Sequence, residues 1–210
     1  MPKKQKPDEV FRALGKRRDN WLQLTDLRLQ GKSARDRARV LVDAANLDDR
    51  LQEAITHRFV ALPKGVRSAL FSDEYAIATF KMKTNLAYAL GIFGDWALHD
   101  LNVIRTIRNG FAHYNTALTL DESSVVEMCR TLVLPDKSKP EFFMFANFGA
   151  DDLAEQRESG RGRWMVSVWA LTTILALDVI RNDVSPKLPA NSWDDWARSD
   201  HREKDPLDPT

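Results

Sequence analysis

Residues 96–114 read WALHDLNVIRTIRNGFAHY, and this stretch decides the fold. Its apolar side chains recur at Leu98, Leu101, Ile104 and Ile107. A step of three or four residues places side chains on one side of an α-helix, because the helix turns once every 3.6 residues. The pattern therefore predicts an amphipathic helix whose apolar stripe packs into a core.

Three other stretches carry a comparable helical pattern, at residues 38–56, 76–92 and 164–181. Between them stand residues that end helices, for example Pro63 and Gly65. Nine glycines and nine prolines in 210 residues are too few for an all-β protein built from many tight turns. The sequence predicts an all-α protein that folds as a single helical-bundle domain with flexible termini.

Composition divides the chain into three expected parts. Residues 1–35 form a basic N-terminal helical segment, residues 36–184 form the helical domain, and residues 185–210 form a flexible tail rich in proline and charge. Gly31 is expected to stop the first helix and Ser33 to cap the next. Two helices joined there form either an ordinary αα-hairpin or a helix-turn-helix followed by arginines.

The C-terminal half contains more loop than the rest of the chain. A short helix is expected to start at residues 121–124 and to run through Cys129. The region from Pro135 to Gly162 is predicted to be the most loop-like part of the interior, with an extended segment over residues 141–148. The uncharged stretch 164–177 is shorter than the roughly 18 residues of a membrane span, so we expect a buried core helix and no membrane.

Overall composition fits a soluble globular protein, with 43% apolar and 29% charged residues. The single cysteine, Cys129, excludes an internal disulfide framework and any metal site built from several cysteines. No phosphate-binding glycine loop, dinucleotide fingerprint or HExxH zinc motif occurs, so neither a cofactor nor a metal is expected. No apolar segment follows the basic residues at the N-terminus, which favours a cytoplasmic location.

Positive charge is concentrated near the N-terminus. Lysine and arginine total 31 and aspartate and glutamate 30 in the whole chain, for a net charge of +1. Residues 1–39 alone carry 12 basic and 5 acidic side chains. This asymmetry is explained either by a nucleic acid or another polyanion that binds there, or by an ordinary solvated helix face.

The candidate chemistry lies in the second half of the stretch quoted above. Asn109 and His113 are four residues apart and share one helix face, which Arg105 joins from the preceding turn. Arg108 lies to the side, but its long side chain can reach the same surface. These residues form either a phosphodiester site or a hydrogen-bond network that joins two helices.

A phosphodiester suits these residue types. Histidine transfers protons near neutral pH, and arginine offers a planar fork for phosphate oxygens and for charge that develops in the transition state. Asparagine adds neutral donors and an acceptor. Because the 2′-hydroxyl of RNA can serve as the nucleophile, such a site can work without a metal.

The segment Arg108-Asn109-Gly110-Phe111-Ala112-His113 resembles the R-(x4–6)-H motif of HEPN domains, including the polar residue that often follows the arginine. Many HEPN domains are all-α, form dimers and cleave RNA without a metal. This resemblance implies that Arg108 and His113 are catalytic and that Asn109 supports them. It also implies a homodimer that brings two such helices together, for which small Gly110 and Ala112 leave room.

A second resemblance lies upstream, over residues 80–91. The sequence FKMKTNLAYALG is similar to the F-x-x-K-x-x-L-A-x-x-L-G helix of the mannitol operon repressor (MltR-like) family, in which an Arg-Asn-x-x-x-His segment soon follows. The resemblance covers roughly residues 38–130, about half of the chain, and contains the two motifs in order. Members of that family are regulators, so this resemblance implies a non-catalytic protein that acts through DNA or a regulatory protein partner. Lys81 and Lys83 are candidates to contact phosphate, or else form a solvated pair.

The sequence thus predicts a dimeric, HEPN-like regulator that acts on nucleic acid, with metal-independent RNA cleavage as its candidate activity in a toxin, stress or defence role. The alternative is a non-catalytic MltR-like transcriptional regulator or protein-interaction domain. Arg108, His113 and Asn109 are the expected catalytic residues. Arg105, Lys81 and Lys83 are the expected nucleic-acid-binding residues.

Overall fold

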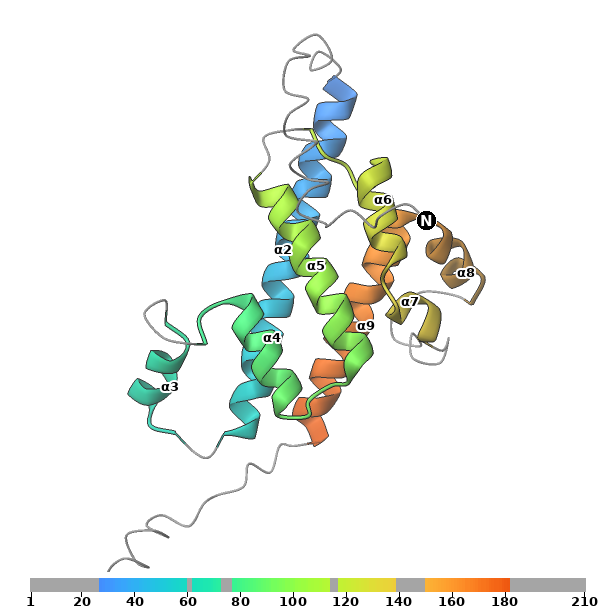
Figure 1. Ribbon diagram of the computed structural model, residues 1–210. Helices are drawn as coiled ribbons and strands as arrows, with labels where there is room; N and C mark the ends of the chain where they lie inside the picture. Colours follow the sequence, from blue (N-terminus) through green and yellow to red (C-terminus); the bar gives the residue numbers. More distant parts are fainter. Residues whose placement is uncertain (1–26, 60–61, 73–76, 114–116, 139–149, 182–210) are drawn as a thin grey trace, which may run out of the picture.

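The computed structural model describes residues 27–59, 62–72, 77–113, 117–138 and 150–181. All regular structure within these ranges is helical, which confirms the predicted all-α class (Figure 1). The termini that were expected to be flexible lie outside the described residues. The helices are α2 (Leu27–Arg58), α3 (Lys64–Leu70), α4 (Phe80–Ala89), α5 (Asp95–His113), α6 (Ser123–Arg130), α7 (Leu134–Lys137), α8 (Ala150–Glu158) and α9 (Gly160–Arg181).

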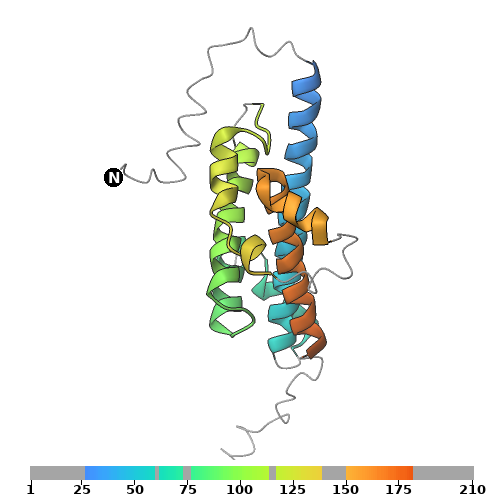
Figure 2. The ribbon, with the colours of Figure 1, turned by 90° about the vertical axis from the view of Figure 1, so that its right-hand side faces the viewer.

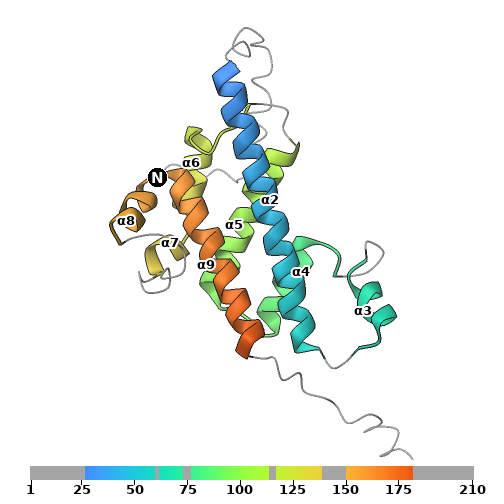
Figure 3. The same cartoon turned by 180° about the vertical axis from the view of Figure 1, so that it is seen from behind.

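Helix α2 is the long central element of the bundle, and α4, α5 and α9 all pack against it (Figures 1 and 3). Its inner side is fully buried at Val40, Leu47 and Leu51. Side-chain bonds to α9 join Asp36 to Arg161 and, further along both helices, Arg58 to Asp178. The two helices therefore run side by side in the same direction, as the turned view in Figure 2 also shows.

The expected break at Gly31 is wrong, because α2 continues through Gly31 and Ser33. Glycine inside a helix destabilises it by roughly 1 kcal/mol relative to alanine, and tertiary contacts outweigh that penalty. Asp36 is buried, and its Oδ2 accepts from the backbone N–H of Leu120 at 2.9 Å and from Arg161 Nη2 at 2.8 Å. No turn separates two helices there, so the helix-turn-helix interpretation is also wrong.

Helix α4 starts at Phe80 and not at residue 76, because Thr79 caps it. The Thr79 hydroxyl accepts from the Met82 backbone N–H at 3.2 Å, which satisfies one of the free amides of the first turn. At the other end Gly91 has a φ of 67°, and the Ile92 N–H donates to Ala87 O at 3.0 Å. This left-handed glycine follows the end of α4 at Ala89, three residues before the end of the predicted range 76–92. Helix α5 begins one residue before the predicted start, which confirms that prediction.

The region 135–162 contains more helix than expected. The short helix α6 was predicted correctly, but α7 and α8 occupy part of the stretch taken as loop, and α9 starts at Gly160 instead of 164. The expected extended segment, residues 141–148, lies outside the described residues. Gly162 allows the tight α8–α9 connection, since a Cβ there would clash with the backbone oxygen of Gln156.

Helix α9 is the second core helix, as predicted. Trp164, Val166, Leu171 and Leu175 are buried on it, and it packs against α2, α6, α7 and α8. By length and composition alone α9 could cross a membrane, and core helices of globular proteins pass the same test. Its ends are tied into the fold by polar contacts, including the bond from Trp164 Nε1 to Asp43 Oδ2 at 2.8 Å.

Candidate functional site

A groove of about 570 Å³ lies where α2, the start of α4 and the last turns of α5 meet. It contains four of the six predicted site residues, and we call it the α4–α5 groove. The predicted residues that line it are Lys81, Arg105, Arg108 and Asn109. The structure thus brings together side chains from positions 81 and 105–109, whereas sequence spacing related only those within α5.

Among the described residues, the cations of this groove have no acidic partner. Arg108 is exposed, and its Nη1 donates to Asn109 Oδ1 at 3.0 Å. Arg105 is half-buried, and its Nε has no hydrogen-bond partner. In the part of the chain that the structure describes, no carboxylate forms an ion pair with Lys81, Arg105 or Arg108. Their positive charge is therefore available to a ligand.

The start of α4 adds to this positive potential. Phe80 and Lys81 form its first turn, and both line the groove together with the capping residue Thr79. The backbone dipoles of a helix sum to a partial positive charge at its N-terminus. The helix thus reinforces the electrostatic effect of the three basic side chains, and Phe80 adds an aromatic surface beside them.

Lys83 serves another purpose. Its side chain is 4% exposed, and its Nζ donates to Asp48 Oδ2 at 2.8 Å. The ammonium also lies 6.0 Å from the centre of the Phe71 ring. Lys83 therefore joins α4 to α2 and neutralises the one carboxylate that lines the groove. The predicted pair Lys81 and Lys83 is split, with one lysine facing the groove and the other fixing its wall.

His113 does not line the groove. It is the last residue of α5 and is exposed, one turn beyond Asn109. Arg37 of α2 fixes the helix beside it, since its Nη2 donates to Ala112 O at 3.0 Å. Within the described ranges no side chain forms a hydrogen bond or ion pair with His113. Its imidazole is thus open to solvent at the groove's end.

Sequence reasoning missed Asp48, Thr79, Phe80 and Arg37. Thr79 was recognisable in principle, because a threonine that precedes an apolar helix is a preferred cap. Asp48 and Arg37 gave no such signal, since each acts on a residue more than 30 positions away. Only the packing of α2 against α4 and α5 gives them a role.

Two buried groups outside the groove have raised pKa values, and both serve structural roles. Burial raises the pKa of Asp100, whose carboxylate accepts from the backbone N–H groups of Val133 and Leu134 and from Ser167 Oγ. Burial also raises the pKa of the Cys129 thiol to about 12, so this cysteine is not a nucleophile at neutral pH. Among the described residues no group of three or more His, Cys, Asp or Glu side chains could hold a metal ion.

The fold and the groove define an all-α helical protein with a cationic groove beside an exposed histidine. No family model matches the chain, and no curated protein or solved structure matches it either.

Proposed function

We propose that the protein is a regulator that binds RNA, and that the α4–α5 groove holds the phosphate backbone. The observation that supports this most directly is the convergence of Lys81, Arg105 and Arg108, none of which pairs with a carboxylate in the described part of the chain. Elsewhere in the chain several cations are paired, as Arg161 is with Asp36. Unpaired cations that share a groove of about 570 Å³ suit a ligand with repeated negative charge.

The groove offers more than charge to an RNA strand. Arg108 has further N–H donors beyond the one bonded to Asn109, so its fork can bind phosphate oxygens. The Phe80 ring stands beside the cations, where a base of a single strand can stack on it. We therefore expect single-stranded RNA to bind more tightly than a duplex.

A second activity, RNA cleavage, is favoured by the exposure of His113 one turn beyond Asn109. In this proposal the His113 imidazole removes the proton of a 2′-hydroxyl, and the oxygen attacks the adjacent phosphorus. The 5′-oxygen takes a proton from water as it leaves, a 2′,3′-cyclic phosphate remains, and the His113 imidazolium then returns its proton to the solvent. Arg108 stabilises the charge that develops on the phosphoryl oxygens, and Asn109 orients the phosphate.

Binding is tested by titrating a fluorescent single-stranded RNA over a range of salt concentrations. Three phosphate contacts predict a slope of log K against log salt of about −2, since each contact in a single strand contributes about −0.7. Arg108→Ala should weaken binding and lower the magnitude of the slope by about 0.7. Arg67→Ala on α3 is a matched control, because Arg67 is exposed and does not line the groove. Equal effects of both substitutions would contradict the proposed site.

Cleavage is tested with purified protein, with and without EDTA. His113→Ala should lower the rate by about 10²- to 10⁴-fold, the usual contribution of general acid–base catalysis, without altering RNA affinity. Arg108→Lys should also be slower, because lysine keeps the charge but loses the bidentate fork. RNA binding without cleavage would leave the non-catalytic regulator, the alternative raised by the MltR-like resemblance. Unchanged cleavage by folded His113→Ala protein would exclude the catalytic assignment.

A further inference from the structure

The exposed side of α2 carries a regular stripe of side chains, spaced alternately four and three residues apart. Steps of this size place all of these side chains on one face of the helix. We call these residues the α2 stripe, and all of them are exposed. They are Arg35, Arg39, Val42, Asn46, Asp49 and Glu53.

The charges of the α2 stripe change sign along the helix. The two N-terminal members are arginines, the two central ones are uncharged and the two C-terminal ones are acidic. In two antiparallel copies centred between Val42 and Asn46, Arg39 of one faces Asp49 of the other, and the outer Arg35 faces Glu53. The stripe is therefore complementary to itself under a two-fold axis. A parallel pair would instead place like charges together.

Within one chain these charges are largely unused. In the described ranges Arg35, Arg39 and Asp49 have no ion pair, and Glu53 pairs only with Arg50, at the surface and at 2.8 Å. At the centre Val42 is 57% exposed. Among the described residues, the stripe thus presents to solvent an exposed valine at its centre, with Arg39 on one side of it and Asp49 on the other free of ion pairs.

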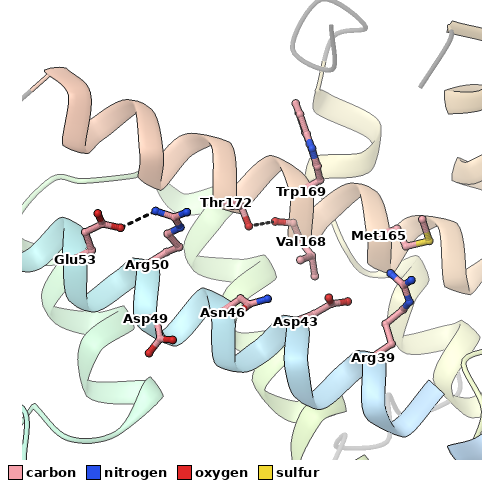
Figure 4. Close-up of a pocket in the computed structure, with 10 residues that line it drawn as sticks. All are labelled: Arg39, Asp43, Asn46, Asp49, Arg50, Glu53, Met165, Val168, Trp169 and Thr172. Carbon is pink, nitrogen blue, oxygen red and sulfur yellow. Dashed lines mark hydrogen bonds and ion pairs between the residues drawn. The ribbon is translucent and has the colours of Figure 1, made fainter. Parts of the chain in front are cut away.

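The surroundings of the stripe leave room for a second helix. The view from behind shows α2 and α9 side by side and uncovered by the other helices of the described chain (Figure 3). Between them lies a groove of about 650 Å³, with charged residues of α2 along one wall (Figure 4). Met165 and Val168 of α9 form apolar parts of the other wall. A partner helix along the stripe covers this apolar wall as well.

We propose that the protein forms a two-fold symmetric homodimer in which the α2 stripes of two copies pack antiparallel. This face differs from the α5 face that the HEPN resemblance implies. Gly110 of α5, which was expected to admit a partner helix, is buried in the chain's own core. The inference does not rest on the proposed RNA activity.

The symmetry has a consequence for the candidate site. The α4–α5 groove lies beside the stripe, since Ala45 lines it, whereas stripe residues such as Asn46 and Asp49 line the α2–α9 groove. A two-fold axis perpendicular to both α2 helices carries the two α4–α5 grooves to the same face of the dimer. One RNA strand can then contact both grooves without wrapping around the protein.

Charge reversal tests this interface without any RNA. Sedimentation or light scattering should give the wild type twice the chain mass of 24.0 kDa. Arg39→Glu places two glutamates against the partner's Asp49 residues, and Asp49→Arg likewise opposes arginines. Each substitution alone should weaken the dimer by about 10- to 100-fold. A wild-type protein that stays monomeric at a concentration of about 100 μM would overturn the proposal.

Mixing the two variants gives the decisive result. An Arg39→Glu chain and an Asp49→Arg chain restore an opposite-charge pair at both contacts, so their equimolar mixture should dimerise as the wild type does. The double variant, which carries both substitutions, should also regain the dimer. Arg67→Glu is the matched control, and circular dichroism checks that every variant stays helical. Single variants that dimerise like the control, or a mixture that stays monomeric, would overturn the proposal.

Discussion

The two flanks of the bundle use the same residue types in opposite ways. On the α9 side Arg163 is 7% exposed, and its guanidinium bonds to Asp136 and to the backbone oxygens of Cys129 and Leu132. In the α4–α5 groove Arg108 is exposed, and among the described residues its one hydrogen-bond partner is the neighbouring Asn109. An arginine whose donors are satisfied within the fold stabilises it, whereas one with free donors can bind a ligand.

Aspartates show the same contrast in their pKa values. The Arg163 guanidinium donates to Asp136 and lowers the pKa of that carboxyl. Asp100 receives neutral donors instead, and its burial raises its pKa. Both residues lie on the α9 side and hold the segment between α6 and α7. The groove side lacks such a network in the described ranges, apart from the pair of Lys83 and Asp48 that fixes its wall.

The largest effect is expected for Arg163→Met. It leaves the backbone oxygens of Cys129 and Leu132 without their donor, so the free energy of unfolding should fall by about 1 to 3 kcal/mol for each buried oxygen. Urea denaturation measures this, with Arg108→Met as the matched variant on the groove side. That variant should change stability by less than about 0.5 kcal/mol. Similar losses of unfolding free energy in the two variants would contradict the distinction between the α9 side and the groove side.

Two glycines give the next comparison. Gly162→Ala places a methyl group against the backbone of Gln156, so we expect a loss of about 1 to 3 kcal/mol from overpacking. Gly31 lies inside α2 with open space around its Cα. Gly31→Ala should therefore stabilise the protein by about 0.4 to 1 kcal/mol. Thermal unfolding of both variants checks the signs, and a destabilising Gly31→Ala would contradict a continuous α2.

A smaller effect depends on pH. The folded-state pKa of Asp136 is lowered, so its charge stabilises the fold above the unfolded pKa, and this contribution is lost as the pH falls through the folded value. Asp136→Asn should be less stable than the wild type near about pH 7. The difference in stability between the two proteins should disappear at acidic pH, where the wild-type carboxyl is protonated. Urea unfolding at several acidic pH values measures this difference in the free energy of unfolding. A difference that does not change with pH would exclude the Asp136 charge as the cause of the lost stability.

Asp100 should behave with the opposite sign. Its folded-state pKa is raised, so its contribution to stability is greatest below the unfolded pKa and declines as the pH rises through the folded value. The pH profile of Asp100→Asn against the wild type reports this. A wild-type advantage that grows with pH would mean that the three donors outweigh burial.

The smallest effect on stability is expected at Lys81. Its side chain is exposed and has no ion pair among the described residues, so Lys81→Gln should change the free energy of unfolding by less than about 0.5 kcal/mol. RNA affinity should nevertheless fall, with a salt slope smaller in magnitude by about 0.7. Unchanged affinity would remove Lys81 from the site and leave α5 alone to bind phosphate.

The sequence by itself determined the helical class and the placement of α5 to within a residue. It also determined that Arg105 and Asn109 share one face. These features are local, because a helix relates residues three and four positions apart through its own geometry. Local sequence patterns of three or four residues could not reveal that α2 continues through Gly31. The contacts that stabilise this part of α2 come from Leu120 and Arg161, which are distant in sequence.

Only the tertiary structure decided which of the predicted residues meet. It separated Lys81 from Lys83, because Asp48 of α2 binds the second of them across 35 positions of sequence. It left His113 beyond the end of the groove and exposed the α2 stripe opposite the core. Helical periodicity selects a face for each side chain, but burial and pairing depend on which other helix covers that face. That choice is made by packing across the whole chain.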